Sequence, residues 1–211
     1  MSILISILAI IIAVVAHEWA HGFMSYLLGD ETAKKDGRLS LNPLKHIDMY
    51  GFLCLLVFHV GWAKPVHINP YMYKNRKLGT ALTAFAGPFM NLIMAFLAIF
   101  SIGIIEKFGL YYTSLFYLLY SFLLPLAYIN IGLALFNLIP IPPLDGSKIV
   151  AAILPDSVYN KLIRYEKFGL VLLFVFIIFG FDMIIDPIHA SIFNSMYEFV
   201  YNFLQIGVGY V

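Results

Sequence analysis

The sequence predicts an all-α polytopic membrane protein, a helical bundle of at least four transmembrane helices. The first observation is composition: 62% of the 211 residues are hydrophobic, 12% are charged, and the mean hydropathy is +0.89. The second is a set of separate apolar stretches, each long enough to cross a hydrocarbon core of about 30 Å. Water-soluble domains do not combine these features, and the net charge of +1 gives no sign of a nucleic-acid partner.

One intramembrane domain is expected over residues 1–211, because no stretch is long and polar enough to form a separate soluble domain. The expected membrane spans cover residues 2–28, 79–105, 114–139 and 166–185. Residues 190–211 place apolar side chains on one helical face, so this tail forms either an amphipathic interfacial helix or a fifth span.

The segment between the first two expected spans has a polar half, residues 29–48, and an apolar half, residues 51–62. The apolar half is too short to cross the membrane as a helix, and Gly61, Pro65 and Pro70 interrupt its end and the residues after it. We therefore expect a membrane-associated β-hairpin or a re-entrant segment here.

Basic residues predict the orientation. Every Lys and Arg except Lys107 falls in residues 29–78 or 140–167, and the positive-inside rule places both segments in the cytosol. The N-terminus then lies outside. His17 lies about 22 Å along the first helix, which leaves it about 8 Å inside the cytosolic boundary.

The first span contains H-E-W-A-H, with His17, Glu18 and His21. Imidazoles four residues apart on a helix face the same way and can share one Zn²⁺, and the adjacent glutamate can act as general base toward water. An ionisable trio inside hydrocarbon is costly and therefore indicates a functional site. One zinc ion per chain is predicted.

A catalytic zinc site uses three protein ligands, so a third must come from elsewhere in the chain. Asp145 is the best candidate, because it follows the third expected span in N-L-I-P-I-P-P-L-D-G, where prolines end the helix near the cytosolic leaflet. The alternative is that Asp145 caps a helix that begins at Gly146. The two roles are compatible.

With both motifs identified, the chain resembles the site-2 protease family of intramembrane zinc metalloproteases, peptidase family M50. H-E-x-x-H matches the first family element, and Asn137, Pro140, Pro143, Asp145 and Gly146 match its N-x-x-P-x-x-P-x-D-G element. G-W-A-K-P-V (residues 61–66) and A-G-P-F-M-N (residues 86–91) resemble its compact bacterial members, which lack a PDZ or CBS domain. The resemblance implies that His17, His21 and Asp145 ligate zinc, that Glu18 is the base and that Asn137 binds the substrate carbonyl or oxyanion.

Three further residues are weaker candidates for substrate binding. Gly61 and Trp62 belong to the region that we expect to pair, as a strand, with an unwound substrate. Asn91 follows small residues that let helices approach closely, so an interhelical hydrogen bond is the favoured role and substrate contact the alternative.

The expected function is hydrolysis of peptide bonds in or near the transmembrane segments of single-span or membrane-anchored proteins. The expected location is the bacterial inner membrane, with the active site near the cytosolic leaflet and the lipid bilayer as surroundings. The alternatives are a membrane metal transporter and an inactive relative that binds membrane proteins without cutting them. Substrate identity and oligomeric state are not predicted.

Overall fold

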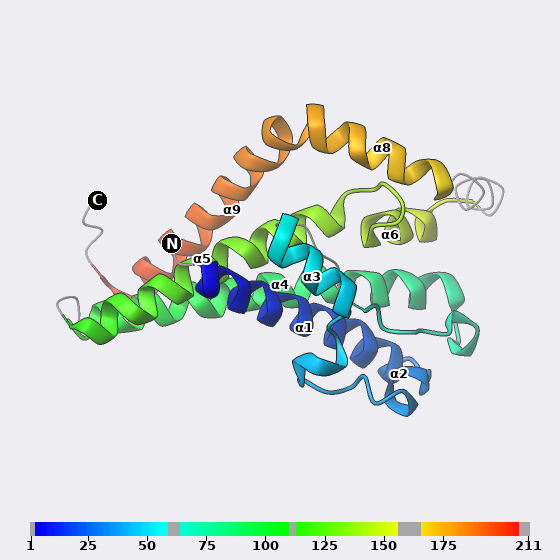
Figure 1. The fold of residues 1–211 in the computed structure, drawn as a ribbon, viewed down its shortest axis with the longest axis horizontal. Helices are drawn as coiled ribbons and strands as arrows, with labels where there is room; N and C mark the ends of the chain where they lie inside the picture. The colour runs from blue at the N-terminus through cyan, green and yellow to red at the C-terminus, as the bar shows by residue number, and fades with distance from the viewer. Residues whose placement is uncertain (1–2, 59–63, 110–112, 156–165, 207–211) are drawn as a thin grey trace. The chain divides into compact units, whose positions relative to one another are not determined.

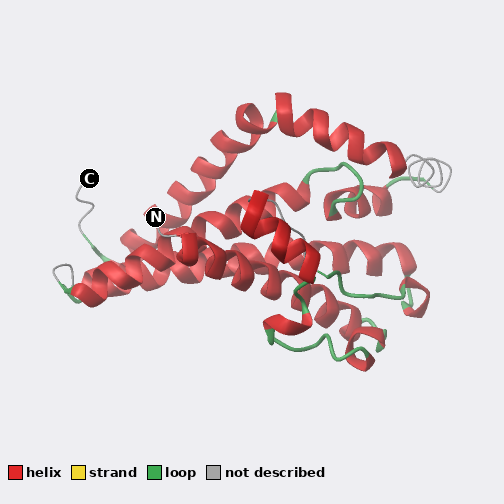
Figure 2. Cartoon of the chain, in the orientation of Figure 1, coloured by secondary structure: helices red, strands yellow, loops and turns green. Residues whose placement is uncertain are grey.

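The described parts of the chain are mostly helical. A computed structural model describes residues 3–58, 64–109, 113–155 and 166–206, and no strand occurs in these ranges (Figures 1 and 2). The α-helices are α1 (Ile3–Leu27), α2 (Thr32–Lys35), α3 (Met49–Phe58), α4 (Arg76–Lys107), α5 (Ser114–Leu138), α6 (Asp145–Ile153), α8 (Glu166–Phe179) and α9 (Phe181–Leu204). Two 3-10 helices, Pro43–Lys45 and Pro70–Met72, lie in the segment between α2 and α4.

Two compact units divide the chain. Unit 1 comprises Met1–Ala13, Asn91–Phe136 and Val175–Val211, and unit 2 comprises Val14–Met90 and Asn137–Phe174. Residues from distant parts of the sequence therefore meet within each unit. The H-E-x-x-H motif and Asp145 both belong to unit 2.

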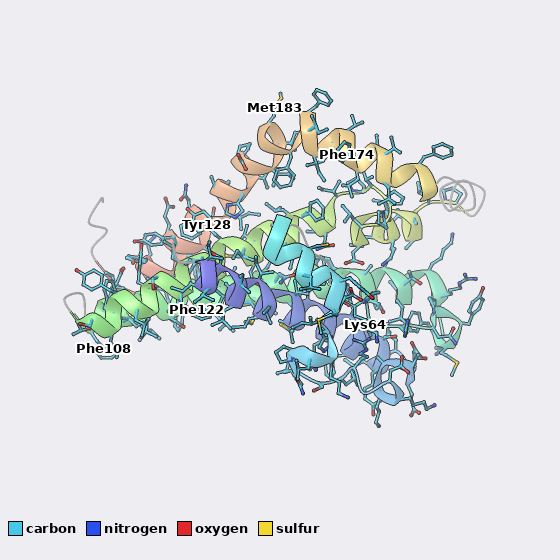
Figure 3. The ribbon with its side chains drawn as sticks, in the orientation of Figure 1. Lys64, Phe108, Phe122, Tyr128, Phe174 and Met183 are labelled. Carbon is cyan, nitrogen blue, oxygen red and sulfur yellow. The ribbon has the colours of Figure 1, made fainter. Side chains whose placement is uncertain are left out.

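Three helices, α1, α4 and α5, are long and apolar enough to cross a membrane, at 25, 32 and 25 residues. A fourth candidate span consists of α8 and α9 together, bent by 73° between Phe179 and Met183. Many of their apolar side chains are exposed, as at Phe174 and Met183 (Figure 3), and apolar surface of this kind suits contact with lipid. The prediction of an all-helical protein is confirmed for the described residues, and the predicted minimum of four spans is reached only if α8 and α9 form one bent span.

The C-terminal helices differ from the predicted boundaries. Residues 166–185 are not one straight helix, because α8 ends at Phe179 and α9 begins after Gly180. The residues predicted as an independent tail continue the helix that starts at Phe181 and ends before Gln205, which has a left-handed φ of 54°. A lone glycine in an apolar run is common inside membrane helices, so the sequence pattern did not reveal this break.

The β-hairpin predicted after the polar loop is wrong for the described residues. Met49–Phe58 form helix α3, and residues 64–69 run to the next 3-10 helix without regular structure. A helix satisfies its own backbone hydrogen bonds, which an apolar segment near lipid requires. Ten residues give about 15 Å, too short to cross the hydrocarbon core. Gly61 and Trp62 lie outside the described residues.

Unit 1 has an apolar core built by four helices. Its buried members are Ala9, Ala98, Ile99, Leu126, Ala127, Val200, Tyr201 and Leu204, from α1, α4, α5 and α9. Gly103 of α4 lies so close to α9 that a methyl group there would be 2.8 Å from Val200 Cγ1. Small residues at such contacts let membrane helices approach closely.

Unit 2 is held together by polar contacts as well as packing. The Arg38 side chain donates to the backbone carbonyl of Lys45, and Asp30 accepts from the backbone of Thr32 and Asn69. Lys77 at the start of α4 donates to the carbonyl of Leu154, 3.0 Å away, just after α6. These bonds fix the loops around the second half of α1, where the H-E-x-x-H motif lies.

Candidate metal centre

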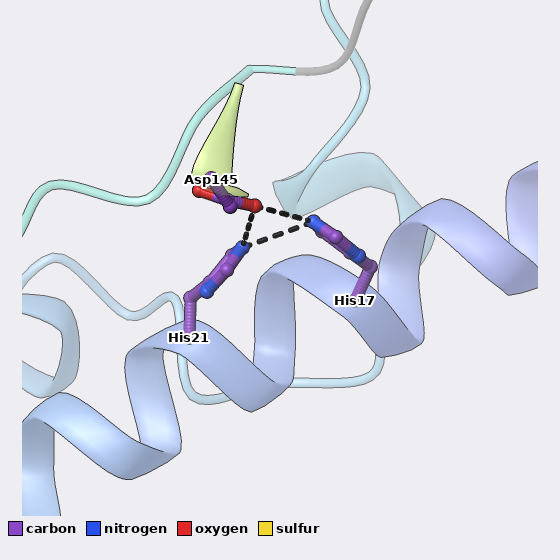
Figure 4. A group of neighbouring side chains, drawn as sticks. All are labelled: His17, His21 and Asp145. Atoms are coloured by element: carbon purple, nitrogen blue, oxygen red, sulfur yellow. Dashed lines mark hydrogen bonds and ion pairs between the residues drawn. The ribbon is translucent and has the colours of Figure 1, made fainter. Parts of the chain in front are cut away.

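Helix α1 brings the two motif histidines to the same place. The Nε2 atoms of His17 and His21 are 2.9 Å apart, and their rings meet edge to face with centroids 4.5 Å apart (Figure 4). Side chains at i and i+4 lie one above the other on a helix, which explains this geometry. Both nitrogens therefore face one point beside α1.

Asp145 reaches that point from α6. Its Oδ2 lies 3.3 Å from His17 Nε2 and 3.0 Å from His21 Nε2 (Figure 4). Asp145 is the first residue of α6, and Leu144 occupies the cap position, so the alternative that Asp145 is the cap is wrong. Gly146 allows this close approach of α6 to the end of α5, because a side chain there would collide with the carbonyl oxygen of Leu138.

The donor set fits a zinc ion. Two imidazole nitrogens and one carboxylate oxygen lie within 4.8 Å of one another. Tetrahedral zinc with bonds of about 2.0–2.1 Å separates its ligand atoms by about 3.3 Å. The three separations here, 2.9, 3.0 and 3.3 Å, are close to that value. Three protein ligands also leave a fourth position for water, as in catalytic zinc sites.

Neighbouring groups orient two of the candidate ligands. His21 Nδ1 lies 2.6 Å from the carbonyl oxygen of Thr83, which can only accept, so Nδ1 carries the proton and Nε2 keeps its lone pair. Lys148 Nζ lies 3.0 Å from Asp145 Oδ1, the carboxylate oxygen that does not face the imidazoles. Burial raises the pKa of Asp145, but hydrogen bonds with His17 and His21 outweigh burial and hold that pKa well below its ordinary value.

Glu18 follows His17 and is half-buried. Its Oε2 accepts a hydrogen bond of 3.0 Å from the backbone N–H of Val66, in the loop that precedes α4. This bond orients the carboxylate and leaves its other oxygen without that constraint. The loop partner was not expected from the sequence, because Val66 is an ordinary apolar residue whose backbone alone makes the contact.

Gly87 of α4 is a site residue that sequence reasoning missed. A methyl group at Gly87 would lie 2.5 Å from His21 Nε2 and 2.7 Å from His17 Cε1, so only glycine lets α4 pack this closely against both imidazoles. Thr83, one turn earlier in α4, provides the carbonyl for His21. The available signal was the four-residue repeat of small residues at Gly79, Thr83 and Gly87.

Two other predicted residues lie outside the cluster of three ligands. Asn137 is half-buried in the last turn of α5, and its role at the oxyanion stays a prediction. Asn91 is fully buried in unit 1, where its amide nitrogen donates to the carbonyl of Ala13 and to Asn130 Oδ1. The favoured interhelical hydrogen bond is thus present, and a substrate contact by Asn91 stays a prediction.

Comparisons with known proteins converge on one family. A family model described as peptidase family M50 matches residues 102–181. A Bacillus subtilis protein provisionally named zinc metalloprotease YwhC is 38% identical over 170 residues, which cover 80% of this chain and 78% of the relative. A Mycolicibacterium smegmatis protein provisionally named zinc metalloprotease Rip2 is 26% identical over 77% of this chain and 62% of its own length. No solved structure gives a significant match.

Proposed function

The chain belongs to peptidase family M50 and is a zinc metalloprotease of the membrane, and on this premise we propose that it cuts membrane-anchored proteins within or beside their transmembrane segments. The family inferred from the two sequence motifs is thereby confirmed, and so is zinc as the cofactor. Membership of a protease family does not favour the alternative of metal transport.

One observation carries the proposal. Asp145 follows His17 and His21 by more than 120 residues in the sequence, yet the ligand atoms of the three residues lie within 4.8 Å of one another. Glu18 lies next to the first of them on α1. Three ligands, an adjacent carboxylate and apolar helices together are what hydrolysis inside a membrane requires.

The chain's own residues would divide the work of hydrolysis. His17, His21 and Asp145 would hold the zinc. The bound zinc would act as a Lewis acid and would lower the pKa of a bound water to about 7. Glu18 would take a proton from the attacking water and return it to the leaving amine nitrogen. The Val66 N–H occupies one Glu18 oxygen, so the other oxygen would take the proton. Asn137, by family resemblance, would donate its amide to the developing oxyanion.

A transmembrane substrate must lose helical structure before it is cut. The carbonyl groups of a helix are engaged in its own hydrogen bonds, so the scissile bond becomes accessible only after local unwinding. We therefore propose single-span or membrane-anchored proteins with helix-breaking residues near the cut as the preferred substrates.

The site would lie near the cytosolic leaflet of a bacterial inner membrane, with the N-terminus outside. The basic residues Arg38, Lys45, Lys77 and Lys148 all belong to unit 2, which holds the candidate metal centre. The positive-inside rule favours the cytosolic side for segments with this charge.

Substitution of the proposed base tests the function. The purified chain, reconstituted in vesicles with a panel of tagged single-span proteins, should cut at least one of them and should contain one zinc per chain. Glu18→Gln should keep the zinc and lower the cleavage rate by about 10²- to 10⁴-fold, the usual contribution of general acid–base catalysis.

Two outcomes would contradict this proposal. Cleavage by Glu18→Gln at the wild-type rate would exclude Glu18 as the base. Absence of cleavage by the wild type, with zinc bound, for every substrate of the panel would favour an inactive relative that binds membrane proteins. Glu31→Gln is a matched control, because Glu31 lies on the polar surface and pairs with Lys35.

A further inference from the structure

A line of polar side chains runs through unit 2 from Asp30 to Thr83. Ser25 Oγ donates to Asp30 Oδ2 at 2.8 Å, and Ser25 Oγ lies 2.7 Å from the hydroxyl of Tyr73. The Tyr73 hydroxyl lies 3.1 Å from Thr83 Oγ1. All four side chains are buried, so each of these bonds lacks competition from water.

The carboxylate fixes the direction of the whole line. An ionised Asp30 can only accept, so the single proton of Ser25 is used on Asp30. Tyr73 must then donate to Ser25, and Thr83 must donate to Tyr73, because each hydroxyl has one proton. The line therefore has one arrangement of protons, and loss of any member leaves a buried hydroxyl with an unfilled bond.

Asp30 is well suited to anchor this line. Besides Ser25 it accepts from the backbone N–H and the hydroxyl of Thr32, at 3.0 and 2.5 Å, and from the backbone N–H of Asn69, at 2.6 Å. Burial raises the pKa of Asp30, but these hydrogen bonds outweigh burial and lower that pKa below its ordinary value. The carboxylate therefore stays ionised at neutral pH and joins the end of α1 to the loop before α4.

The other end of the line reaches a candidate zinc ligand. Thr83, whose hydroxyl is held by Tyr73, presents its carbonyl oxygen to His21 Nδ1 at 2.6 Å. We propose that Tyr73, with Ser25 and Asp30, is a positioning residue for the metal centre: the line holds Thr83 in the register that orients the His21 imidazole toward the metal. The inference rests on the proposed metal site and names residues that support it from outside.

Close packing along α4 fixes the position of Thr83 relative to Tyr73 and His21. A methyl group at Gly79 would lie 2.5 Å from Tyr73 Cδ2, and one at Gly87 would lie 2.5 Å from His21 Nε2. Gly79, Thr83 and Gly87 follow one another by one turn each, so one face of α4 contacts the Tyr73 ring, the line and both imidazoles. A shift of α4 that breaks the Tyr73–Thr83 bond must also move the carbonyl that His21 uses.

A positioning role for Tyr73 predicts an effect on metal binding, which a purely stabilising role does not. Groups that hydrogen-bond a metal-ligating histidine typically contribute about 10- to 100-fold to metal affinity. A merely structural hydroxyl would lower the unfolding temperature and leave both zinc affinity and the geometry of the bound metal unchanged.

The test uses Tyr73→Phe in the full chain, purified in detergent, with Tyr71→Phe as matched control. Tyr71 is two residues away and exposed, so its variant loses the same hydroxyl without touching the line. Zinc affinity is measured by competition with a chelator, and metal geometry by the visible absorption spectrum of the Co²⁺-substituted protein. Because the Thr83 carbonyl stays in place, we expect Tyr73→Phe to bind zinc about 10-fold more weakly, the lower end of the effect of a direct partner, and to alter the Co²⁺ bands. Tyr71→Phe should change neither.

Wild-type zinc affinity together with a wild-type Co²⁺ spectrum in Tyr73→Phe would overturn the proposal. Thr83→Val removes the same bond from the other side and keeps the branched shape, so it decides the question alone if Tyr73→Phe does not fold. The double variant should lose no more affinity than Tyr73→Phe alone, because Tyr73→Phe already removes the bond between Tyr73 and Thr83. Fully additive losses would also overturn the proposal.

The same measurements separate this inference from the proposed function. If the wild type binds zinc and Asp145→Asn does not, the metal site stands whatever Tyr73→Phe does. If wild-type zinc binding does not depend on Asp145, the proposed function fails first, before the role of Tyr73 is judged.

Discussion

Unit 1 and unit 2 bury polar side chains of different kinds. Among the described residues of unit 1, two polar side chains other than tyrosine are buried, the amides of Asn91 and Asn130. Asn91 donates to Asn130 at 2.8 Å, and Asn130 donates to the carbonyl of Leu126, also at 2.8 Å. Neutral amides that bond to each other and to backbone join helices in an apolar environment at modest cost.

Unit 2 buries eight such side chains in its described part, and five of them are ionisable. They are His17, Ser25, Asp30, Arg38, His46, Thr83, Asp145 and Ser147. Ionisable groups are far more costly to bury than amides, so a cluster of them indicates function more strongly than the asparagine pair does. The contrast teaches that burial of a polar residue in a membrane protein is informative mainly when the residue can carry charge.

The comparison predicts its largest effect at Asp145. Asp145→Asn replaces an anionic ligand with a neutral amide of the same shape. If a zinc site binds with about 10–16 kcal/mol, one ligand of three accounts for about 3–5 kcal/mol, or a loss of zinc affinity of about 10²- to 10⁴-fold. Metal analysis after dialysis against a chelator measures this loss. Retention of stoichiometric zinc would show that the ion binds elsewhere and would break the comparison.

A pair of glycines sharpens the comparison further. Gly87→Ala in unit 2 should lower zinc affinity by about 10- to 100-fold, because the added methyl group meets His21 Nε2 at 2.5 Å. Gly132→Ala in unit 1 is the matched control, since its methyl group would lie 3.9 Å from His189 Cδ2, an ordinary contact. Both changes favour helix by up to about 1 kcal/mol, so a loss confined to Gly87→Ala identifies the clash.

Equal effects of the two alanine variants on zinc affinity would contradict this interpretation. Chelator competition measures the zinc affinity of both variants in parallel. Their unfolding temperatures show whether either substitution destabilises the whole protein. The expected result is a changed affinity in one variant and an unchanged affinity in the other.

The ligands of the candidate site could be predicted from sequence because local rules determine them. Helical periodicity alone places His17 and His21 on one face, and the proline-rich turn after α5 marks Asp145 as the start of a new element. Gly87, Thr83 and Tyr73 could not be predicted in the same way. Their roles depend on the register of α4 against α1, which tertiary packing sets and no local pattern records.

The fold shows the same division. The long apolar runs of α1, α4 and α5 were predictable, because only helices satisfy their backbone in lipid. Residues 51–62 were predicted as a β-hairpin or a re-entrant segment, and Met49–Phe58 is a helix, because a short apolar run fits a strand or a helix equally well. The bend at Gly180 was missed, because a single glycine in an apolar run does not by itself mark the end of a helix.

The smallest effect is expected in unit 1, from Asn130→Leu. The change removes the acceptor of Asn91 and the donor to the Leu126 carbonyl, and it keeps a side chain of similar size. Interhelical hydrogen bonds in membrane proteins contribute about 0.6 kcal/mol on average and about 1.7 kcal/mol at most. The free energy of unfolding should therefore fall by about 0.6 to 1.7 kcal/mol. Zinc affinity should stay at the wild-type value, because the asparagine pair joins helices and holds no ligand. Unfolding in detergent, followed by circular dichroism, measures the free energy of unfolding, and chelator competition measures the zinc affinity.

A loss of zinc affinity in Asn130→Leu as large as that in Gly87→Ala would contradict this prediction. Neutral amides in unit 1 would then support the metal as directly as the ionisable groups of unit 2, and the distinction between the two units would fail.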